Sequence, residues 1–534
     1  MPSLVTDNFR VFAAQQFIES LAEPFTGQTQ DVDSSTSAQA YRSKIYLFIG
    51  RSYNWNDVNG TIKEKYGSLS SVSDQTPPNP VDNLDELNEI YDDMIAIKRI
   101  QPADVSHVIR KRNWQSGIVY DMYRHDYGPS NLAKASLQPK LYDSSFYVLT
   151  DDFRVYKCIY NGQTPAGGAY PNGKPSTVKP SATTPTIQTT GDGYRWKYMY
   201  TIGVADYIKF VSTDFIPVKI ESTVVNAAIS GSIDQVLIQN AGSGLVINGS
   251  TTSGTVYTSI DGNGTGGIVQ ITISSGVITN ASVSAVGTGY TFGYIDLSKC
   301  YSTSNLSGSI VGLGINATTA NIIPIISPPG GHGKNALSEL GGYRVMINKS
   351  IEFLDGNGDI PVNMEFRRFG LIEDPQISSL DFVETTGTVC KAVKFLDTTP
   401  ETTTFLNGEI ITQTRTVNGV TYEAKGRVIH WDTINKVLRY YQNEYISAAQ
   451  ESVGSKNKLI AFEGNSAISS STGSATPDSA FTGTIAGLPA IQFTNGYFTS
   501  EITPYSGNIL YVENRKPVFR SNDQIEDVKL VIEF

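Results

Sequence analysis

Residues 507–534, at the C-terminal end of the sequence, constrain the fold more than any other stretch. Apolar residues occupy every second position from Val528 to Phe534, which is the period of a strand with one buried face. A shorter β-prone run at 509–512 precedes it, and Pro517 is expected to end that run because proline cannot donate to a sheet ladder. A terminal strand needs neighbours, so we expect its partner strands to come from regions far upstream.

The composition favours strands over long helices. Only 17% of the 534 residues are charged and 48 are glycine, whereas an average globular domain has about 25% charged residues. With 40% hydrophobic residues the chain can bury sizeable cores, and its length predicts several domains. We therefore predict a mainly β, multidomain protein.

Two segments show the three- and four-residue spacing of apolar side chains that is typical of amphipathic helices. The first is predicted over 7–23, where Phe9 and Phe12 belong to the apolar stripe. The second is predicted over 83–98, with an N-cap at 82 or 83, where aspartate and asparagine stand. Apart from these two helices, the predicted secondary structure consists mainly of strands.

Several runs predict strands. The apolar run 44–50 is typical of a central strand buried on both faces. Runs 145–149 and 154–160 flank an Asp-Asp turn and predict a hairpin, and 195–202 alternates as a strand does. Two further strands, 342–347 and 364–372, are predicted to be joined through a hairpin turn.

Shifts in composition divide the chain into five segments. Charge almost disappears after about residue 222 and returns near Lys334, and a further β-rich block follows residue 380. The predicted division is a core in three parts with two inserted all-β domains between them. The core parts are 1–221, 331–379 and 496–534, and the inserts are 222–330 and the small barrel-like 380–495.

Three glycine-rich stretches resemble ligand loops only superficially. Those at 262–267 and 287–289 are followed by β-prone residues rather than by a helix that could receive phosphate, so turn glycines are the better interpretation. The stretch 330–335 has asparagine where a P-loop needs serine or threonine. The stretch 355–359 opens like a calcium loop but has Phe366 at the position of the bidentate glutamate, which favours a hairpin turn.

Charge and cysteine content exclude further classes. The net charge of −10 argues against nucleic-acid binding, which needs a basic surface. No run approaches the roughly 18 apolar residues of a membrane span, and the N-terminus does not read as a secretory signal. Cys158, Cys300 and Cys390 are too few and too widely spaced for a disulfide framework, so we expect buried thiols in a protein made in a reducing cytosol.

No catalytic, cofactor-binding or metal site is predicted. The four histidines, at 107, 125, 332 and 430, have no metal-ligand spacing. The concentrated basic cluster at Arg110, Arg112 and Trp114 is interpreted as a protein-contact site, because arginine and tryptophan are favoured anchors of interfaces. Arg515 is a further predicted interface residue.

Six stretches taken together resemble the dimeric baseplate wedge protein of T-even-like contractile-tailed bacteriophages. They occur in the order of that family. They are FIGRS (48–52) with Trp55, VIRKRNW (108–114), VYKC (155–158), GDGYRWKY (191–198), FRRF (366–369) and LYVENRKP (510–517), the last followed by Asp523 and Gln524. The resemblance covers about 1–221, 331–377 and 497–534, and it leaves out 222–330 and 380–495.

The resemblance implies a layered β-sandwich core with two helix-bearing loops, to which this chain adds two inserted all-β domains. It implies a homodimer without catalysis, which assembles with other baseplate wedge subunits in the host cytoplasm and is located in the virion tail. The alternatives that the residues leave open are a carbohydrate-binding adhesin or tail-fibre-type receptor binder, with Trp431, Tyr290 and Tyr294 as first candidates, and a β-sandwich glycosidase that uses distant paired carboxylates.

Overall fold

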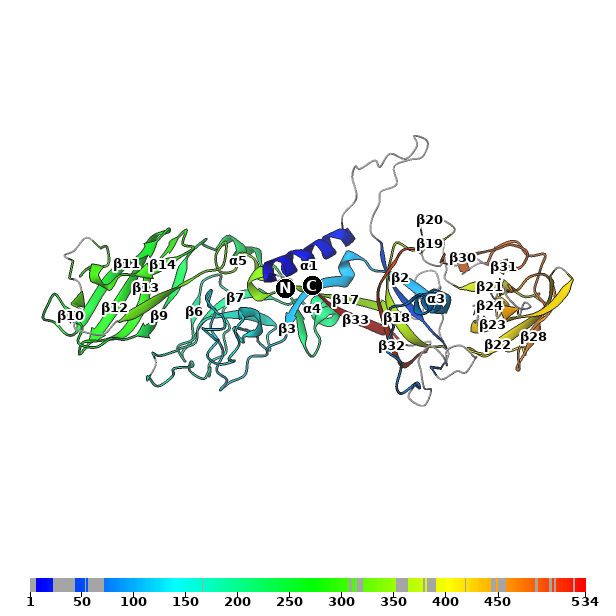
Figure 1. Ribbon diagram of the computed structural model, residues 1–534, viewed down its shortest axis with the longest axis horizontal. Helices are drawn as coiled ribbons and strands as arrows, with labels where there is room; N and C mark the ends of the chain where they lie inside the picture. Colours follow the sequence, from blue (N-terminus) through cyan, green and yellow to red (C-terminus); the bar gives the residue numbers. More distant parts are fainter. Residues whose placement is uncertain are drawn as a thin grey trace, which may run out of the picture. The chain divides into compact units, whose positions relative to one another are not determined.

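The computed structural model is mainly β, with multiple antiparallel sheets and few helices, which confirms the predicted fold class (Figure 1). Strands far apart in the sequence are neighbours in several sheets. The structure describes residues 6–22, 44–52, 54–55, 72–165, 167–306, 310–311, 313–314, 320–351, 364–377, 380–381, 390–417, 419–442, 448–449, 458–485, 488–498, 502–503, 506–521 and 524–534. The predicted turn at 355–359 lies outside these residues.

The chain forms two compact units, each discontinuous in sequence. Unit 1 comprises Met1–Phe17, Ser106–Met346 and Val531–Phe534, and unit 2 comprises Ile18–Val105 and Ile347–Leu530. The five-segment division expected from the sequence stays a prediction.

The main core of unit 1 packs against a sheet of order β4-β5-β7-β6. Tyr147 pairs with Lys157 and Leu149 with Val155, which confirms the predicted hairpin. Trp196 is fully buried in this core. The strand bounds are Tyr147–Leu149 (β4), Arg154–Tyr160 (β5), Gln188–Thr189 (β6) and Arg195–Thr201 (β7).

Residues 233–326 of unit 1 contain their own sheets and their own apolar cluster. One sheet has the order β13-β12-β11-β14, whose strands lie side by side in Figure 1. In β12, Val269, Ile271 and Ile273 are buried at every second position, as in a strand with one core face. The bounds are Ile233–Asn240 (β9), Val246–Ile247 (β10), Gly254–Gly262 (β11), Thr265–Ser274 (β12), Val277–Thr288 (β13), Gly293–Ile295 (β14), Leu313–Gly314 (β15) and Asn321–Ile326 (β16); β9 pairs with β16 and β10 with β15.

The C-terminal strand β33 is the edge of a sheet of order β33-β17-β3-β8. Half-buried and exposed side chains alternate along its first residues, so the predicted period is present but the inner face is only half-buried. The Phe534 amide donates to the Tyr343 carbonyl, 3.2 Å away, and the Phe534 ring lies 5.5 Å from that of Phe17. The bounds are Val105–Arg110 (β3), Phe215–Pro217 (β8), Arg344–Ile351 (β17) and Glu526–Glu533 (β33).

Unit 2 contains a sheet of order β2-β1-β18-β32. Every residue of β1 is buried, which confirms the prediction of a central strand. The bounds are Ile45–Gly50 (β1), Met94–Arg99 (β2), Met364–Glu373 (β18) and Asn508–Arg520 (β32).

The expectation that Pro517 ends the strand before it is wrong, because β32 continues past this residue to Arg520. The pairing with β18 shifts register here: Phe366 lies opposite Val518, whereas Arg368 lies opposite Asn514. The proline therefore falls in a bulge on an edge strand, where its missing N–H breaks no ladder hydrogen bond.

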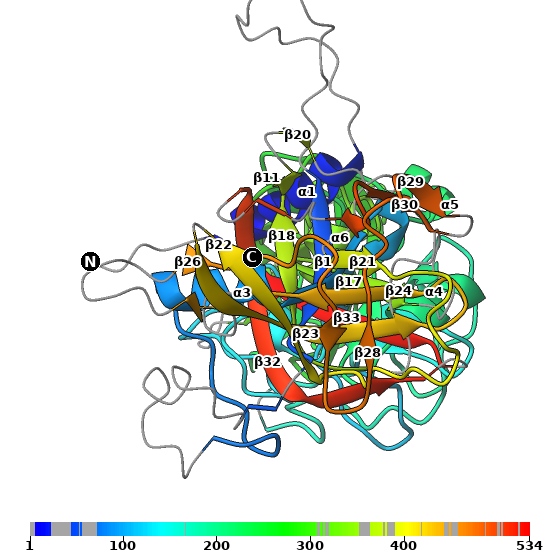
Figure 2. The ribbon, with the colours of Figure 1, turned by 90° about the vertical axis from the view of Figure 1, so that its right-hand side faces the viewer.

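A seven-stranded sheet of order β28-β27-β22-β23-β24-β21-β31 forms the rest of the unit 2 core. Its longest strand, β23, pairs with β22 on one side and with β24 on the other, and β21 follows β24 (Figure 2). The sheet includes the three strands predicted between 408 and 441. Phe395, just after β21, and Pro477, just after β28, form an antiparallel bridge that links the two sides of the sheet. The bounds are Lys391–Lys394 (β21), Ile410–Val417 (β22), Val420–Asp432 (β23), Val437–Tyr441 (β24), Ile468–Ser469 (β27), Ser474–Ala475 (β28) and Tyr497–Phe498 (β31).

Helix α1 covers Asp7–Ala22, and its Thr6 hydroxyl accepts a hydrogen bond from the Phe9 amide. Its apolar stripe differs from the predicted one. Phe9 and Phe12 are 61% and 55% exposed, whereas Val11 and Ala14 are buried. The buried face runs through Val11, Ala14 and Leu21, and the spacing of the phenylalanines did not identify it.

The second helix is shorter than predicted. Helix α3 covers Leu84–Asp93, and Asn83 caps it by accepting a hydrogen bond from the Glu86 amide, 2.8 Å away. The remaining residues to 98, predicted as helix, belong to β2, which pairs antiparallel with β1. The isoleucines at 95 and 97 suit a sheet, and pairing with a strand distant in sequence overrides the local helical spacing.

The predicted hairpin between 342–347 and 364–372 does not form. These residues belong to β17 and β18, which lie in different sheets, so the two strands do not pair. Cys158, Cys300 and Cys390 are buried free thiols, as expected. Gly287 and Gly289 have positive φ values of 63° and 80°, which supports their interpretation as turn glycines.

The remaining elements are short. The helical ones are η2 (Pro102–Asp104), η3 (Leu141–Asp143), α4 (Val204–Phe210), α5 (Ser222–Asn226), η4 (Leu297–Lys299) and α6 (Ala336–Leu340). The strand pairs are β19 (Gln376–Ile377) with β20 (Leu380–Asp381), β25 (Ala448–Ala449) with β26 (Lys458–Leu459), and β29 (Gly483–Ile485) with β30 (Leu488–Phe493).

Candidate functional site

The predicted contact cluster in unit 1 has one outward and two inward members. Arg110, the last residue of β3, is exposed. The Arg112 guanidinium donates to the Asp143 carbonyl at 2.9 Å, and Trp114 Nε1 donates to Ser176 Oγ at 3.1 Å. Arg112 and Trp114 thus hold loops together within unit 1. Arg110, whose guanidinium carbon lies 5.5 Å from the centroid of the Phe215 ring, is the member that is exposed to a partner.

Arg515, the predicted contact residue in unit 2, lies on the edge strand β32. Its side chain is 56% exposed and pairs with Glu513 at 2.9 Å. Leu510 and Phe519 on the same strand are 46% and 53% exposed. A long edge strand with exposed apolar side chains is a surface suited to protein contacts.

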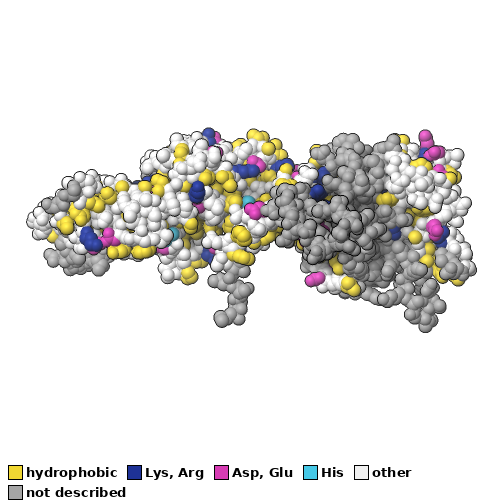
Figure 3. All heavy atoms as spheres, turned by 90° about the horizontal axis from the view of Figure 1, so that it is seen from above, with side chains coloured by type: hydrophobic (Ala, Val, Ile, Leu, Met, Phe, Trp, Pro, Cys, Tyr) yellow, Lys and Arg dark blue, Asp and Glu magenta, His cyan; other side chains and the backbone are white. Residues whose placement is uncertain are grey.

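Charge is sparse on the described part of the face in Figure 3, where lysine, arginine, aspartate and glutamate are scattered among uncharged residues. This agrees with the low charged fraction of the sequence. Many of the charges in unit 2 are instead buried.

A buried ion-pair network connects α3 to β18 in unit 2. The Arg368 guanidinium lies 2.7 Å from Glu86 and 3.4 Å from Asp93, and its Nε donates to Asn514 at 2.9 Å. Arg51 also pairs with Asp93, at 3.6 Å. The side chains of Arg51, Arg368, Glu86 and Asp93 are all at most 2% exposed.

An aromatic ring completes this network. Arg51 stacks over the Trp55 ring, with its guanidinium carbon 4.1 Å from the ring centroid. Trp55 Nε1 donates to the Arg515 carbonyl at 2.8 Å. The motifs FIGRS with Trp55, FRRF and LYVENRKP, far apart in sequence, therefore meet in one buried cluster whose role is to hold unit 2 together.

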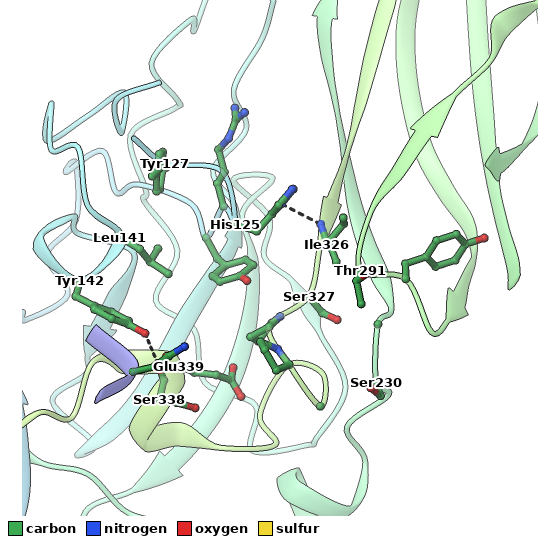
Figure 4. A pocket seen from close by; sticks show the side chains of 18 of the residues that line it. His125, Tyr127, Leu141, Tyr142, Ser230, Thr291, Ile326, Ser327, Ser338 and Glu339 are labelled. Atoms are coloured by element: carbon green, nitrogen blue, oxygen red, sulfur yellow. Dashed lines mark hydrogen bonds between the residues drawn. The ribbon is translucent and has the colours of Figure 1, made fainter. Parts of the chain in front are cut away.

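Unit 1 contains a pocket of about 660 Å³ (Figure 4). Tyrosines 123, 127, 142 and 290 contribute to its wall. His125 Nδ1 accepts a hydrogen bond from the Ile326 amide at 3.2 Å, so the neutral imidazole carries its proton on Nε2. Burial holds the pKa of His125 below its usual value. The pocket can surround a small molecule with aromatic faces and hydroxyl groups.

Next to this pocket lies a buried ion pair between Lys157 of β5 and Glu339 of α6. The other carboxylate oxygen of Glu339 accepts from the Gly333 and Asn335 amides at 2.7 and 3.2 Å. Burial lowers the pKa of Lys157, and the carboxylate of Glu339 opposes that shift. With both carboxylate oxygens engaged, Glu339 acts as a structural anchor of the 333–335 turn.

The sequence reasoning missed these buried charges. Lys157 and Lys197 each stand between apolar or aromatic residues in the middle of a strand, and a charged residue at such a position signals a buried partner. The partners themselves, such as Glu339, are too far away in sequence to be found from spacing. The double arginine at 367–368 within a strand was the corresponding signal in unit 2.

Within the described ranges, no group of three or more histidine, cysteine, aspartate or glutamate side chains is placed to hold a metal ion. Among the same residues, no helix has the length and apolar character needed to cross a membrane. No protein-family model matches the chain, and no curated protein matches it either.

Proposed function

We propose that the chain is a structural subunit of a bacteriophage tail baseplate wedge and acts by protein–protein assembly in the contractile tail. The observation that carries the proposal is the ordered set of six sequence motifs. Residues of three of them meet in the buried cluster of unit 2, around Arg51, Arg368 and Asn514. Motif residues that hold a fold together are expected to recur in a family that shares the fold.

The motifs in unit 1 have a similar role. The ring of Tyr194 stacks on that of Trp196, with centroids 5.3 Å apart, and Tyr194 accepts a hydrogen bond from the Tyr120 amide. Trp114 and Cys158 lie in or against the same core cluster. This placement supports a shared fold, and the virion location, the homodimer and the wedge partners remain part of the proposal.

The edge strand β32 is the surface that we expect to contact a neighbouring subunit. Leu510 and Phe519 are exposed there beside Arg515. A partner strand or loop could cover these apolar side chains, and a cationic Arg515 would favour an acidic neighbour.

The test is co-expression of the chain with the other tail proteins of its own genome, followed by affinity purification and native mass spectrometry. We expect a homodimer and a complex with at least one tail protein. The double variant Leu510→Lys, Phe519→Lys should no longer form one of these two complexes. Ile434→Lys, at a residue that is 87% exposed on a turn of unit 2, is the matched control and should keep it. A chain that stays monomeric and captures no tail protein would contradict the proposal.

A carbohydrate-binding receptor protein is the second candidate function. Trp431 and Tyr290, two of its expected contact residues, are buried at 9% and 2% exposure. Tyr294 is 56% exposed and stands two positions after Phe292, which is 57% exposed. This aromatic pair favours sugar binding at β14, and a glycan array on which Tyr294→Ala removes the signal would support it over the structural role.

A further inference from the structure

A second pocket of unit 1, of about 220 Å³, lies over the face of β7 that carries Arg195 and Lys197. These two residues stand two positions apart on the strand and therefore point to the same side of the sheet. Asp234, at the start of β9, and His332 complete its polar wall. The pocket is separate from the interface surface of β32, and its interpretation does not depend on the proposed function.

The two cations of this pocket have neutral oxygen partners. Lys197 is 5% exposed, and its ammonium group donates to the Pro185 carbonyl. Arg195 Nη1 donates to the Asp234 carbonyl at 2.6 Å and to Gln235 Oε1 at 2.7 Å. Within the described part of the chain, neither residue has a carboxylate within ion-pair distance. A buried cation without a carboxylate is unfavourable unless another anion compensates it.

The neighbouring carboxylates compensate only part of this positive charge. Lys157 stands opposite Lys197 in the sheet register and forms an ion pair with the Glu339 carboxylate. The Asp234 carboxylate accepts from the Ser232 hydroxyl at 2.6 Å. Among the residues that the structure describes, three cations, Arg195, Lys197 and Lys157, therefore face two carboxylates, those of Glu339 and Asp234, and one positive charge is left over.

His332 provides an independent sign of a missing ligand. Its side chain is 4% exposed, and its Nδ1 atom has no hydrogen-bond partner among the described residues. Its Nε2 atom lies 4.0 Å from the Asp234 carboxylate. Burial and the charges of Lys157, Lys197 and Arg195 hold the pKa of His332 well below its usual value, so the ring is neutral. A neutral imidazole ring can form a hydrogen bond with a bound group.

We propose that this pocket binds a small oxyanion, that is, a phosphate or carboxylate group held by Arg195 and Lys197 with His332 beside it. The Nε and Nη2 atoms of Arg195 have no partner among the described residues and form the fork that binds two oxygen atoms of such a group. The Lys197 ammonium group supplies a point charge with donors to spare. The bound anion balances the leftover positive charge.

Isothermal titration calorimetry of the full chain with inorganic phosphate, and separately with acetate, at constant ionic strength set with chloride, tests the proposal. Saturable binding is expected, together with a rise in melting temperature that grows with the concentration of the anion. Binding of phosphate alone identifies a phosphoryl group as the ligand, and binding of acetate alone identifies a carboxylate.

Lys197→Met and Arg195→Met should each weaken binding at least tenfold. Lys179→Met is the matched control, because Lys179 is a surface residue paired with Asp151 at 2.6 Å, and it should bind as the parent does. If Lys197→Met fails to fold, Arg195→Met decides. No saturable binding by the parent chain, or equal binding by the parent and a folded pocket variant, would overturn the proposal.

Discussion

Arg368 lies at the centre of the buried network of unit 2, with Glu86, Glu89 and Asp93 within 3.7 Å of its guanidinium. A buried ion pair adds little net stability as a whole, but removal of one partner leaves the other charges buried without compensation. Arg368 therefore helps to keep three acidic side chains of α3 inside the protein, together with Arg51, which also pairs with Asp93.

Arg368→Met should lower the free energy of unfolding of unit 2 by about 3–5 kcal/mol, which corresponds to a melting temperature lower by about 10 °C. Arg515→Met, at an exposed arginine of the same unit, should change stability by less than about 0.5 kcal/mol. Thermal unfolding followed by circular dichroism measures both. Equal melting temperatures for the two variants would show that the network carries no stability.

His430 is a second residue for which we make a prediction, in this case about the pH dependence of stability. Burial, together with the Arg439 charge across the strand pair, lowers the pKa of His430 to about 4 in the folded state. The unfolded chain has an ordinary pKa of about 6.5 and therefore binds the proton first as the pH falls. The stability that this residue contributes is complete above about pH 6.5 and is lost as the pH falls toward 4.

His430→Gln should remove this loss. Between pH 7 and pH 4.5 the parent chain should lose about 1–3 kcal/mol more stability than the variant. Urea unfolding of both proteins at several pH values measures the difference. Parallel pH profiles for parent and variant would mean that His430 is not the titrating group.

At the scale of elements, the sheet β2-β1-β18-β32 depends on close approach of its strands. Gly370 of β18 lies opposite Phe48 of β1 on one side and Val512 of β32 on the other. A Cβ atom at this position would meet the Tyr511 carbonyl oxygen at 2.2 Å and the Phe48 ring at 2.6 Å. The edge strand can pack here only because position 370 has no side chain.

Gly370→Ala should therefore push β32 away from β18 and cost about 1–3 kcal/mol or more. Gly128→Ala is the control, because a Cβ atom there would meet nothing within 4 Å. Melting temperatures of the two variants give the comparison. If the edge strand is the assembly surface, Gly370→Ala should also weaken partner binding before it unfolds the chain.

For the molecule as a whole, the predicted insert 222–330 contributes side chains to the main core of unit 1. Leu237 of β9 and Ile325 of β16 belong to the main core cluster of unit 1, and Asp234 faces its buried cations. Asn240 and Asn321 lie opposite each other at the far ends of β9 and β16. The chain could be shortened there with little damage to the core.

Replacement of residues 241–320 by a two-residue Asn-Gly turn, which suits a tight hairpin, should leave a folded chain, with Val236 and Ile322 changed to threonine to avoid exposed apolar surface. Deletion of the whole stretch 222–330 should lower the melting temperature further, because it also removes Leu237, Ile325 and Asp234. Gel filtration and thermal unfolding compare the two deletion variants. A longer deletion that is as stable as the shorter one would show that the core is independent of β9 and β16.

Features that depend on residues close together in the chain can be predicted from the sequence. The central strand at 45–50, the β4–β5 hairpin and the Asn83 cap follow from local period, turn residues and side-chain hydrogen bonding. The mainly β class follows from composition and alternation. These signals involve only a few consecutive residues, so they can be recognised without knowing which distant segments pack against them.

Features that depend on residues far apart in the chain become visible in the folded protein alone. Helix α3 ends at Asp93 because the next residues pair with β1, and β32 runs through Pro517 because a bulge on the sheet edge needs no donor there. Arg368 and Lys157 are buried because acids from distant helices compensate them. Pairing and burial energies outweigh local propensity, and a linear spacing does not encode which residues supply them.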